Sequence, residues 1–281
     1  MKGLSMPKNN EILNYQKQAA GNQAKQEAQA YVNSLRSAVD FTRMELPDID
    51  WFVPGLIAPG LTTIAGQSKA GKSWLLLQLG LAVSAGGLFI GNRKCRKADV
   101  LYLALEDNDR RVARRLYRLG IPATRDLYIE TANKLTPQNI NEILDAVPFV
   151  KMLIFDTQGR YFENETTDGN DYNEMTRMVA TLHAIANKRD MAIITCTHTR
   201  KNVDKEDWVN SVIGSKALVA VSDTILMLTR ERESTEGKLH ITGRDVDEFT
   251  IEMEHTEDWL WYDKKTDFTA TEPLSEFEQF R

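Results

Sequence analysis

The hydrophobic residues of this chain follow two patterns that alternate from residue 61 to about residue 196. Short continuous apolar runs, which are typical of strands buried on both faces, are followed by longer segments with apolar residues at helical spacing. The runs predict strands at 61–65, 100–105, 127–130, 152–155 and 192–196, and the longer segments predict helices at 73–84, 107–119, 136–146 and 172–188. This alternation indicates an α/β fold, with a mostly parallel sheet flanked by helices.

Local signals sharpen the predicted boundaries. Gly120 and Pro122 should end the helix that begins at Asp107, while Thr136 and Pro137 have the residue types of an N-cap and a first helical turn. After Asp223 the apolar residues alternate with polar ones, and polar turns separate the segments. These segments predict an antiparallel extension of the sheet, with strands at 224–228, 238–242, 249–253 and 259–262.

The N-terminal segment has a different composition, rich in Asn, Gln, Lys and Ala. Tyr31, Leu35 and Val39 recur at helical spacing, so we expect a helix with a narrow apolar stripe. Such a stripe cannot form a core alone, and the helix must dock elsewhere or fray. The predicted organisation is a helical or flexible arm at 1–46, one large domain at 47–263 and a mobile tail at 264–281.

Composition excludes several classes of protein. With 42% hydrophobic and 27% charged residues, the chain of 281 residues is neither a disordered nor a membrane protein. Its net charge of -5 argues against a histone-like basic coat but leaves room for a local basic groove. Cys95 and Cys196 are far apart, and we find no signal peptide or membrane-spanning apolar run, so we expect a cytoplasmic protein without membrane contact.

One motif points directly to chemistry. Between an apolar strand and an apolar helix the chain matches G-x-x-x-x-G-K-[ST], through Gly66, Gln67, Ser68, Lys69, Ala70, Gly71, Lys72 and Ser73. Glycines let backbone N–H groups curl around phosphates, and the helix N-terminus adds positive potential. We expect ATP here, with Lys72 at the β- and γ-phosphates and the Ser73 hydroxyl on Mg²⁺. A chance glycine-rich turn is the alternative.

Two acidic residues complete the predicted site. Asp156 ends the strand 152–155 and suits a magnesium carboxylate, although a strand end is also an ordinary place for Asp. Thr157 follows, so the base that activates water must come from elsewhere. Glu106 ends the strand 100–105, and the carboxyl ends of parallel strands open to one crevice. The alternative is that Glu106 and Asp107 only favour the N-terminus of the next helix.

The order of these motifs resembles the RecA-fold ATPases. The resemblance is closest to the RepA-like hexameric replicative helicases of plasmids and phages, which are relatives of the DnaB helicase core. It covers about Ile49 to Tyr262 and implies a RecA-like P-loop core with a C-terminal antiparallel extension. The matching stretches are 51–66, the loop, 101–107, 153–157 with Arg160, 192–198, Gly214 with Ser215, and Gly243 with Arg244 and Asp245.

The resemblance also implies roles for single residues. Glu106 would be the catalytic base, and His198 would sense the γ-phosphate. Arg244 would be an arginine finger that reaches into the neighbouring subunit's site, which requires a homo-oligomer and suggests a hexamer. From the residues alone, His198 is equally a polar strand-end residue, and Arg244 is equally a surface charge paired with Asp245 or Asp247.

The segment after His198 is the candidate contact for single-stranded DNA. In RecA-like rings this loop faces the central channel. Arg200, Lys201 and Lys205 would contact phosphates, and Trp208 would stack on a base. Three acids interrupt the basic residues, so a solvated loop of mixed charge stays open as an alternative: Asp204, Glu206 and Asp207.

Four functions are compatible with the sequence. The first is an ATP-hydrolysing, ring-forming DNA helicase or translocase of a mobile-element replication system, with ATP and Mg²⁺ as cofactors. The second is a RecA/RadA-like recombination or repair ATPase without unwinding activity. The third is a small-molecule kinase, although the chain shows no compact arginine-rich lid. The fourth is a nucleotide-switched assembly protein that hydrolyses slowly.

Overall fold

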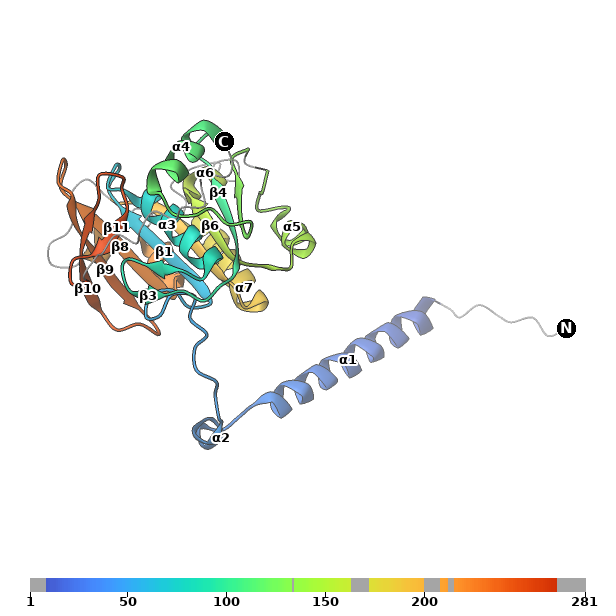
Figure 1. The fold of residues 1–281 in the computed structure, drawn as a ribbon. Coiled ribbons are helices and arrows are strands. Elements are labelled where there is room, and N and C mark those ends of the chain that lie inside the picture. The colour runs from blue at the N-terminus through green and yellow to red at the C-terminus, as the bar shows by residue number, and fades with distance from the viewer. Residues whose placement is uncertain (1–8, 133, 163–171, 200–207, 212–214, 267–281) are drawn as a thin grey trace. The chain divides into compact units, whose positions relative to one another are not determined.

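The computed structural model describes residues 9–132, 134–162, 172–199, 208–211 and 215–266 (Figure 1). The chain divides into two compact units, Met1–Asp48 and Ile49–Arg281. The predicted tail at 264–281 lies outside the described residues from residue 267 onward.

The first unit contains two helices where the sequence predicts one apolar stripe. Helix α1 (Asn9–Ser34) ends before α2 (Ala38–Arg43) begins. Ser37 starts the second helix through a capping box, in which its hydroxyl accepts from the Asp40 N–H and the Asp40 carboxylate accepts from the Ser37 N–H. The break separates Tyr31 from Val39, and both side chains are exposed.

A nine-stranded sheet forms the second unit, in the order β11-β10-β9-β8-β1-β7-β6-β4-β5 (Figure 1). Its parallel strands are β1 (Gly60–Gly66), β4 (Asp99–Ala104), β5 (Leu127–Glu130), β6 (Val150–Asp156), β7 (Ala192–His198) and β8 (Thr224–Arg230). The antiparallel strands are β9 (Glu236–Gly243), β10 (Phe249–His255) and β11 (Trp261–Asp263). The predicted fold class is confirmed, with one difference: β8 pairs in parallel with β1, so the antiparallel extension starts at β9.

Helices cover both faces of this sheet. Met152 and Ile154 of β6 belong to the core cluster that contains α3 (Lys72–Ala85), while Leu153 and Phe155 belong to the cluster that contains α7 (Tyr172–Arg189). Successive side chains of a strand point to opposite faces, so continuous apolar strands need two helical layers. The smaller elements are β2 (Leu88–Phe89), β3 (Arg93–Lys94), α4 (Asp109–Leu119), α5 (Ile140–Ala146), α6 (Gln158–Phe162), the 3-10 helix η1 (Trp208–Ser211) and α8 (Ser215–Val221).

Two helix starts differ from the sequence predictions. Asn108 caps α4 by accepting from the Arg111 N–H at 3.0 Å, so this helix begins two residues after Asp107. The predicted N-cap at Thr136 is wrong, because its own N–H donates to Asn139 Oδ1 at 2.7 Å and residues 136–139 form a turn before α5. Among the helices that the structure describes, none is long and apolar enough to span a membrane.

Candidate nucleotide-binding site

The predicted phosphate loop joins the end of β1 to the start of α3. Gly66 must lack a side chain, because a Cβ there would lie 2.5 Å from the carbonyl oxygen of Leu228. Gly71 has a φ of 105°, and a Cβ there would lie 2.9 Å from the Trp261 ring. The two fixed glycines of the motif are therefore required by their surroundings in this fold.

The side chain of Lys72 folds back over this loop. Its Nζ donates to the carbonyl oxygens of Gly66 at 2.7 Å and Gln67 at 3.0 Å. Burial lowers the pKa of Lys72, while the charges of Asp156 and Glu106 oppose this shift. The structure thus places a buried amine at the loop, beside two carboxylates.

His198 lies at the end of β7, directly beside Gly66 in the strand register. Its Nδ1 is 3.4 Å from both the Nζ of Lys72 and the Oγ of Ser68. Burial and the positive charge of Lys72 lower the pKa of His198, so the imidazole is neutral at pH 7. The structure therefore brings His198 to the phosphate loop.

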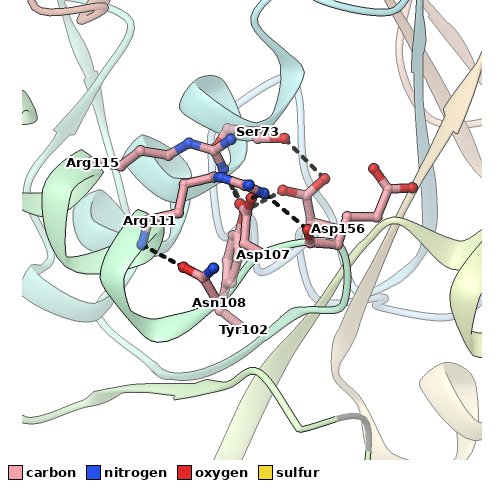
Figure 2. Close-up of polar contacts among 8 residues, drawn as sticks. Ser73, Tyr102, Asp107, Asn108, Arg111, Arg115 and Asp156 are labelled. Atoms are coloured by element: carbon pink, nitrogen blue, oxygen red, sulfur yellow. Dashed lines mark hydrogen bonds and ion pairs between the residues drawn. The ribbon is translucent and has the colours of Figure 1, made fainter.

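Asp156 and Ser73 meet at the carboxyl end of the sheet (Figure 2). The Ser73 hydroxyl donates to Asp156 Oδ1 at 3.1 Å, and the Tyr102 hydroxyl donates to Asp156 Oδ2 at 2.7 Å. Burial raises the pKa of Asp156, and the two hydrogen bonds counteract this shift. Sequence reasoning missed Tyr102, although a tyrosine in a buried strand needs a partner for its hydroxyl.

These oxygen atoms fit magnesium. A hydroxyl and a carboxylate are the hard ligands that Mg²⁺ prefers, and such sites use one or two protein ligands together with phosphate oxygens and water. Within the described parts of the chain, no group of three or more His, Cys, Asp or Glu side chains could hold a metal ion. Ser73 and Asp156 are thus the residues that would hold the ion.

Glu106 and Asp107 point to different partners. Glu106 Oε1 accepts from the Thr157 hydroxyl at 2.8 Å, on the residue that follows Asp156. Asp107 pairs with Arg111 at 2.8 Å and with Arg115, both on α4 (Figure 2). Asp107 therefore serves the next helix, whereas Glu106 turns toward the end of β6.

Arg244 lies far from the phosphate loop of its own subunit. The loop follows Gly66 at the carboxyl end of β1, whereas Arg244 follows Gly243, which pairs with Thr224 near the opposite end of the sheet. Its guanidinium donates to Asp223 Oδ1 and to the Ala220 carbonyl oxygen, both at 3.1 Å. Its carboxylate partner is thus Asp223 rather than either of the acids next to it in sequence.

The candidate DNA loop is described only at its end. Arg200, Lys201 and Lys205 lie outside the described residues. Trp208 is half-buried and packs against His240, with 5.6 Å between the ring centroids. In this arrangement His240 covers part of the indole that the sequence predicts will stack on a base.

The phosphate loop and the strands around it are shared with known proteins. A family model described as an AAA domain matches residues 28–204, more than half of the chain. The chain belongs to this AAA domain family. The AAA domain is 25% identical to the DNA repair protein RadA of Listeria monocytogenes over 66% of this chain and 37% of that protein. Its identity to RadA of Streptococcus pneumoniae is also 25%, over 80% of this chain and 48% of that protein.

Solved structures show the same fold. The AAA domain is similar to a solved ATPase domain, with a TM-score of 0.55, 14% identity, and coverage of 73% of this chain and 84% of the other. It is also similar to the RadB recombinase, with a TM-score of 0.54, 17% identity, and coverage of 74% and 92%. The protein is thus a RecA-like P-loop ATPase, as the resemblance implied, and it spans less than half the length of the RadA proteins that it matches.

Proposed function

We propose that this protein is a ring-forming, DNA-stimulated ATPase that acts as a helicase or translocase in the replication system of a mobile element. One observation carries the proposal. Two consecutive residues at the end of β6 each hold one part of a hydrolytic site, because Asp156 binds the Ser73 hydroxyl and Thr157 binds the Glu106 carboxylate. This links the side chain that would hold the metal ion to a carboxylate that would accept a proton from water.

The residues divide the chemistry of hydrolysis among them. The loop N–H groups and Lys72 would bind the β- and γ-phosphates of ATP, and Ser73 and Asp156 would hold Mg²⁺. The bound ion neutralises phosphate charge during the reaction. Glu106 would take the proton of the attacking water, and neutral His198 would form a hydrogen bond with the γ-phosphate or that water.

The position of Arg244 supports a head-to-tail oligomer. An arginine at the far end of the sheet cannot complete the site of its own subunit, whereas a neighbour stacked in the same orientation would bring its Arg244 to this loop. Guanidinium charge at the transferring phosphate stabilises the transition state. We propose a hexameric ring whose sites are completed in trans, with single-stranded DNA contacted through Arg200, Lys201 and Lys205.

A recombination or repair ATPase without unwinding activity is the second candidate. It is supported by the similarity to proteins that are named for repair and recombination, RadA and RadB. The two candidates share the fold and the nucleotide chemistry. They differ in whether ATP turnover separates DNA strands.

We also propose a cytoplasmic location. Cys95 and Cys196 are both free and buried. Burial raises the pKa of Cys95 to about 12, which keeps this thiol protonated and unreactive.

The decisive experiment measures ATP turnover with and without single-stranded DNA, on protein whose mass in solution is determined at the same time. We expect Mg²⁺-dependent turnover that rises with DNA, and strand displacement from a forked duplex. Lys72→Met is the control for contaminating ATPases. Stimulation without strand displacement would favour the repair alternative, and turnover that ignores DNA would reject both candidates. Lys201→Glu should weaken single-strand binding if the proposed loop makes the contact.

A further inference from the structure

Arg230 lies beside the phosphate loop, although 161 positions separate it from Lys69 in the sequence. It is the last residue of β8, and β8 pairs in parallel with β1, whose end leads into the loop. Its Nη2 donates to the Lys69 carbonyl oxygen at 2.7 Å, and its Nε donates to the Ala70 carbonyl oxygen at 3.2 Å. One guanidinium therefore binds two consecutive carbonyl groups of the loop.

These two bonds fix the orientation of the peptide groups. In a trans peptide the C=O and the next N–H point in opposite directions. Holding the Ala70 carbonyl against Arg230 therefore directs the Gly71 N–H away from Arg230. The φ of 67° at Lys69 is a conformation that non-glycine residues seldom adopt, so this backbone needs support from its surroundings.

Arg230 is itself held in place. Its Nη1 donates to the Ser234 carbonyl oxygen at 2.6 Å, and its guanidinium lies 5.0 Å from the centroid of the Trp259 ring. On the same side of the loop, Gln78 binds both the N–H and the carbonyl of Trp261, at 3.0 and 2.8 Å. Because the Trp261 ring contacts Gly71, the antiparallel extension supports the loop at two successive points.

We infer that Arg230 is a positioning residue for polyphosphate binding, which orients the backbone of residues 69–71 before the nucleotide arrives. The inference rests on the proposed binding of ATP at this loop. Arg230 acts through the loop backbone, so its role should appear in binding affinity rather than in the chemical step. A preorganised cradle binds its ligand more tightly because the ordering cost is met during folding.

The test compares binding of Mg·ATP and of inorganic tripolyphosphate by titration calorimetry. Arg230→Ala should weaken both by a similar factor, roughly 10- to 100-fold, as expected for misorienting one or two donors to a charged group. Turnover at saturating ATP should change by less than about threefold, since Glu106 and Asp156 are untouched. Arg230→Lys should recover little affinity, because an ammonium group cannot reproduce the planar fork. Arg232→Ala, which removes an exposed arginine from the adjacent turn, is the charge-matched control and should bind both ligands normally.

Three outcomes would overturn the inference: wild-type affinity in Arg230→Ala, an equal loss in Arg232→Ala, or a loss for ATP but not for tripolyphosphate. If Arg230→Ala does not fold, Arg230→Lys decides, together with amide hydrogen exchange of residues 66–73, which should be faster than in the wild type. Unchanged exchange and affinity in Arg230→Lys would count against the inference. Wild-type binding of tripolyphosphate is measured without DNA, so a failure of DNA stimulation leaves this test intact.

Discussion

The hydroxyl of Tyr102 donates a 2.7 Å hydrogen bond to Oδ2 of Asp156, and both side chains are almost completely buried. This bond occupies one carboxylate oxygen and leaves Oδ1 facing the Ser73 hydroxyl. It also offsets part of the cost of burying a negative charge. Tyr102 therefore holds the proposed metal ligand in one orientation from inside the sheet.

Removing this hydroxyl should weaken magnesium binding. We expect Tyr102→Phe to raise the Mg²⁺ concentration for half-maximal ATPase activity roughly tenfold, the usual scale for a partner that orients a metal ligand. The free energy of unfolding should fall by about 1 kcal/mol. Tyr128→Phe, on the neighbouring strand, removes an exposed hydroxyl and is the control. An unchanged Mg²⁺ requirement in Tyr102→Phe would show that Asp156 needs no such support.

The contact between Glu106 and Thr157 predicts a graded loss of turnover. Glu106→Gln removes the proposed base and should lower kcat by about 10²- to 10⁴-fold while ATP still binds. Thr157→Val keeps the shape but removes the hydroxyl that holds Glu106, and we expect a smaller loss of about tenfold. Glu142→Gln, at an exposed position on α5, should hydrolyse normally. Turnover within threefold of wild type in Glu106→Gln would assign the base elsewhere.

The separation of Arg244 from its own loop predicts complementation between inactive variants. Arg244→Ala keeps its phosphate loop, and Lys72→Ala keeps its arginine. Mixed rings should therefore contain active interfaces and hydrolyse ATP faster than either variant alone. The Arg244 side chain is 55% exposed and its ion pair contributes little stability, so both variants should assemble. If assembled mixtures show no gain, Arg244 does not act across subunits.

The lowered pKa of His198 predicts a titration that can be observed by NMR in the nucleotide-free protein. Its midpoint should lie below the ordinary value of about 6.5. Lys72→Met should raise the midpoint, because it removes one of the two causes of the shift. Adding tripolyphosphate should also raise it by supplying negative charge. His198→Gln assigns the signal among the four histidines, and a midpoint above 6.5 without ligand would contradict the contact with Lys72.

The sign of the shift also sets a stability profile. A lowered folded-state pKa means that the unfolded chain binds this proton more readily. The contribution of neutral His198 is therefore present above the unfolded pKa and is lost as the pH falls through the lower folded value. Above about pH 6.5, Lys72→Met should leave this part of the pH profile flat, and the measurement is chemical denaturation across pH 5–8.

Predictions that depended on short-range pattern agree with the structure, and those that depended on distant partners do not. The motif at 66–73 and the apolar run at 152–155 sit on a loop and on β6 because both signals lie within a few residues. Thr136 has the residue type of an N-cap, but Asn139 offers a side-chain oxygen to its N–H and forms a turn instead. For Arg244, sequence neighbours suggested an acid nearby, whereas the actual partner is 21 residues away.

The sequence by itself determined the alternation of strands and helices, the phosphate loop and the two acids that follow neighbouring strands, because spacing and residue type encode these features locally. Only the tertiary structure decided which strands are neighbours. With β4 beside β6, Tyr102 meets Asp156, and with β8 beside β1, Arg230 meets Lys69. Strand order is set by the packing of the whole sheet against both helical layers, and hydrophobic periodicity carries no record of it.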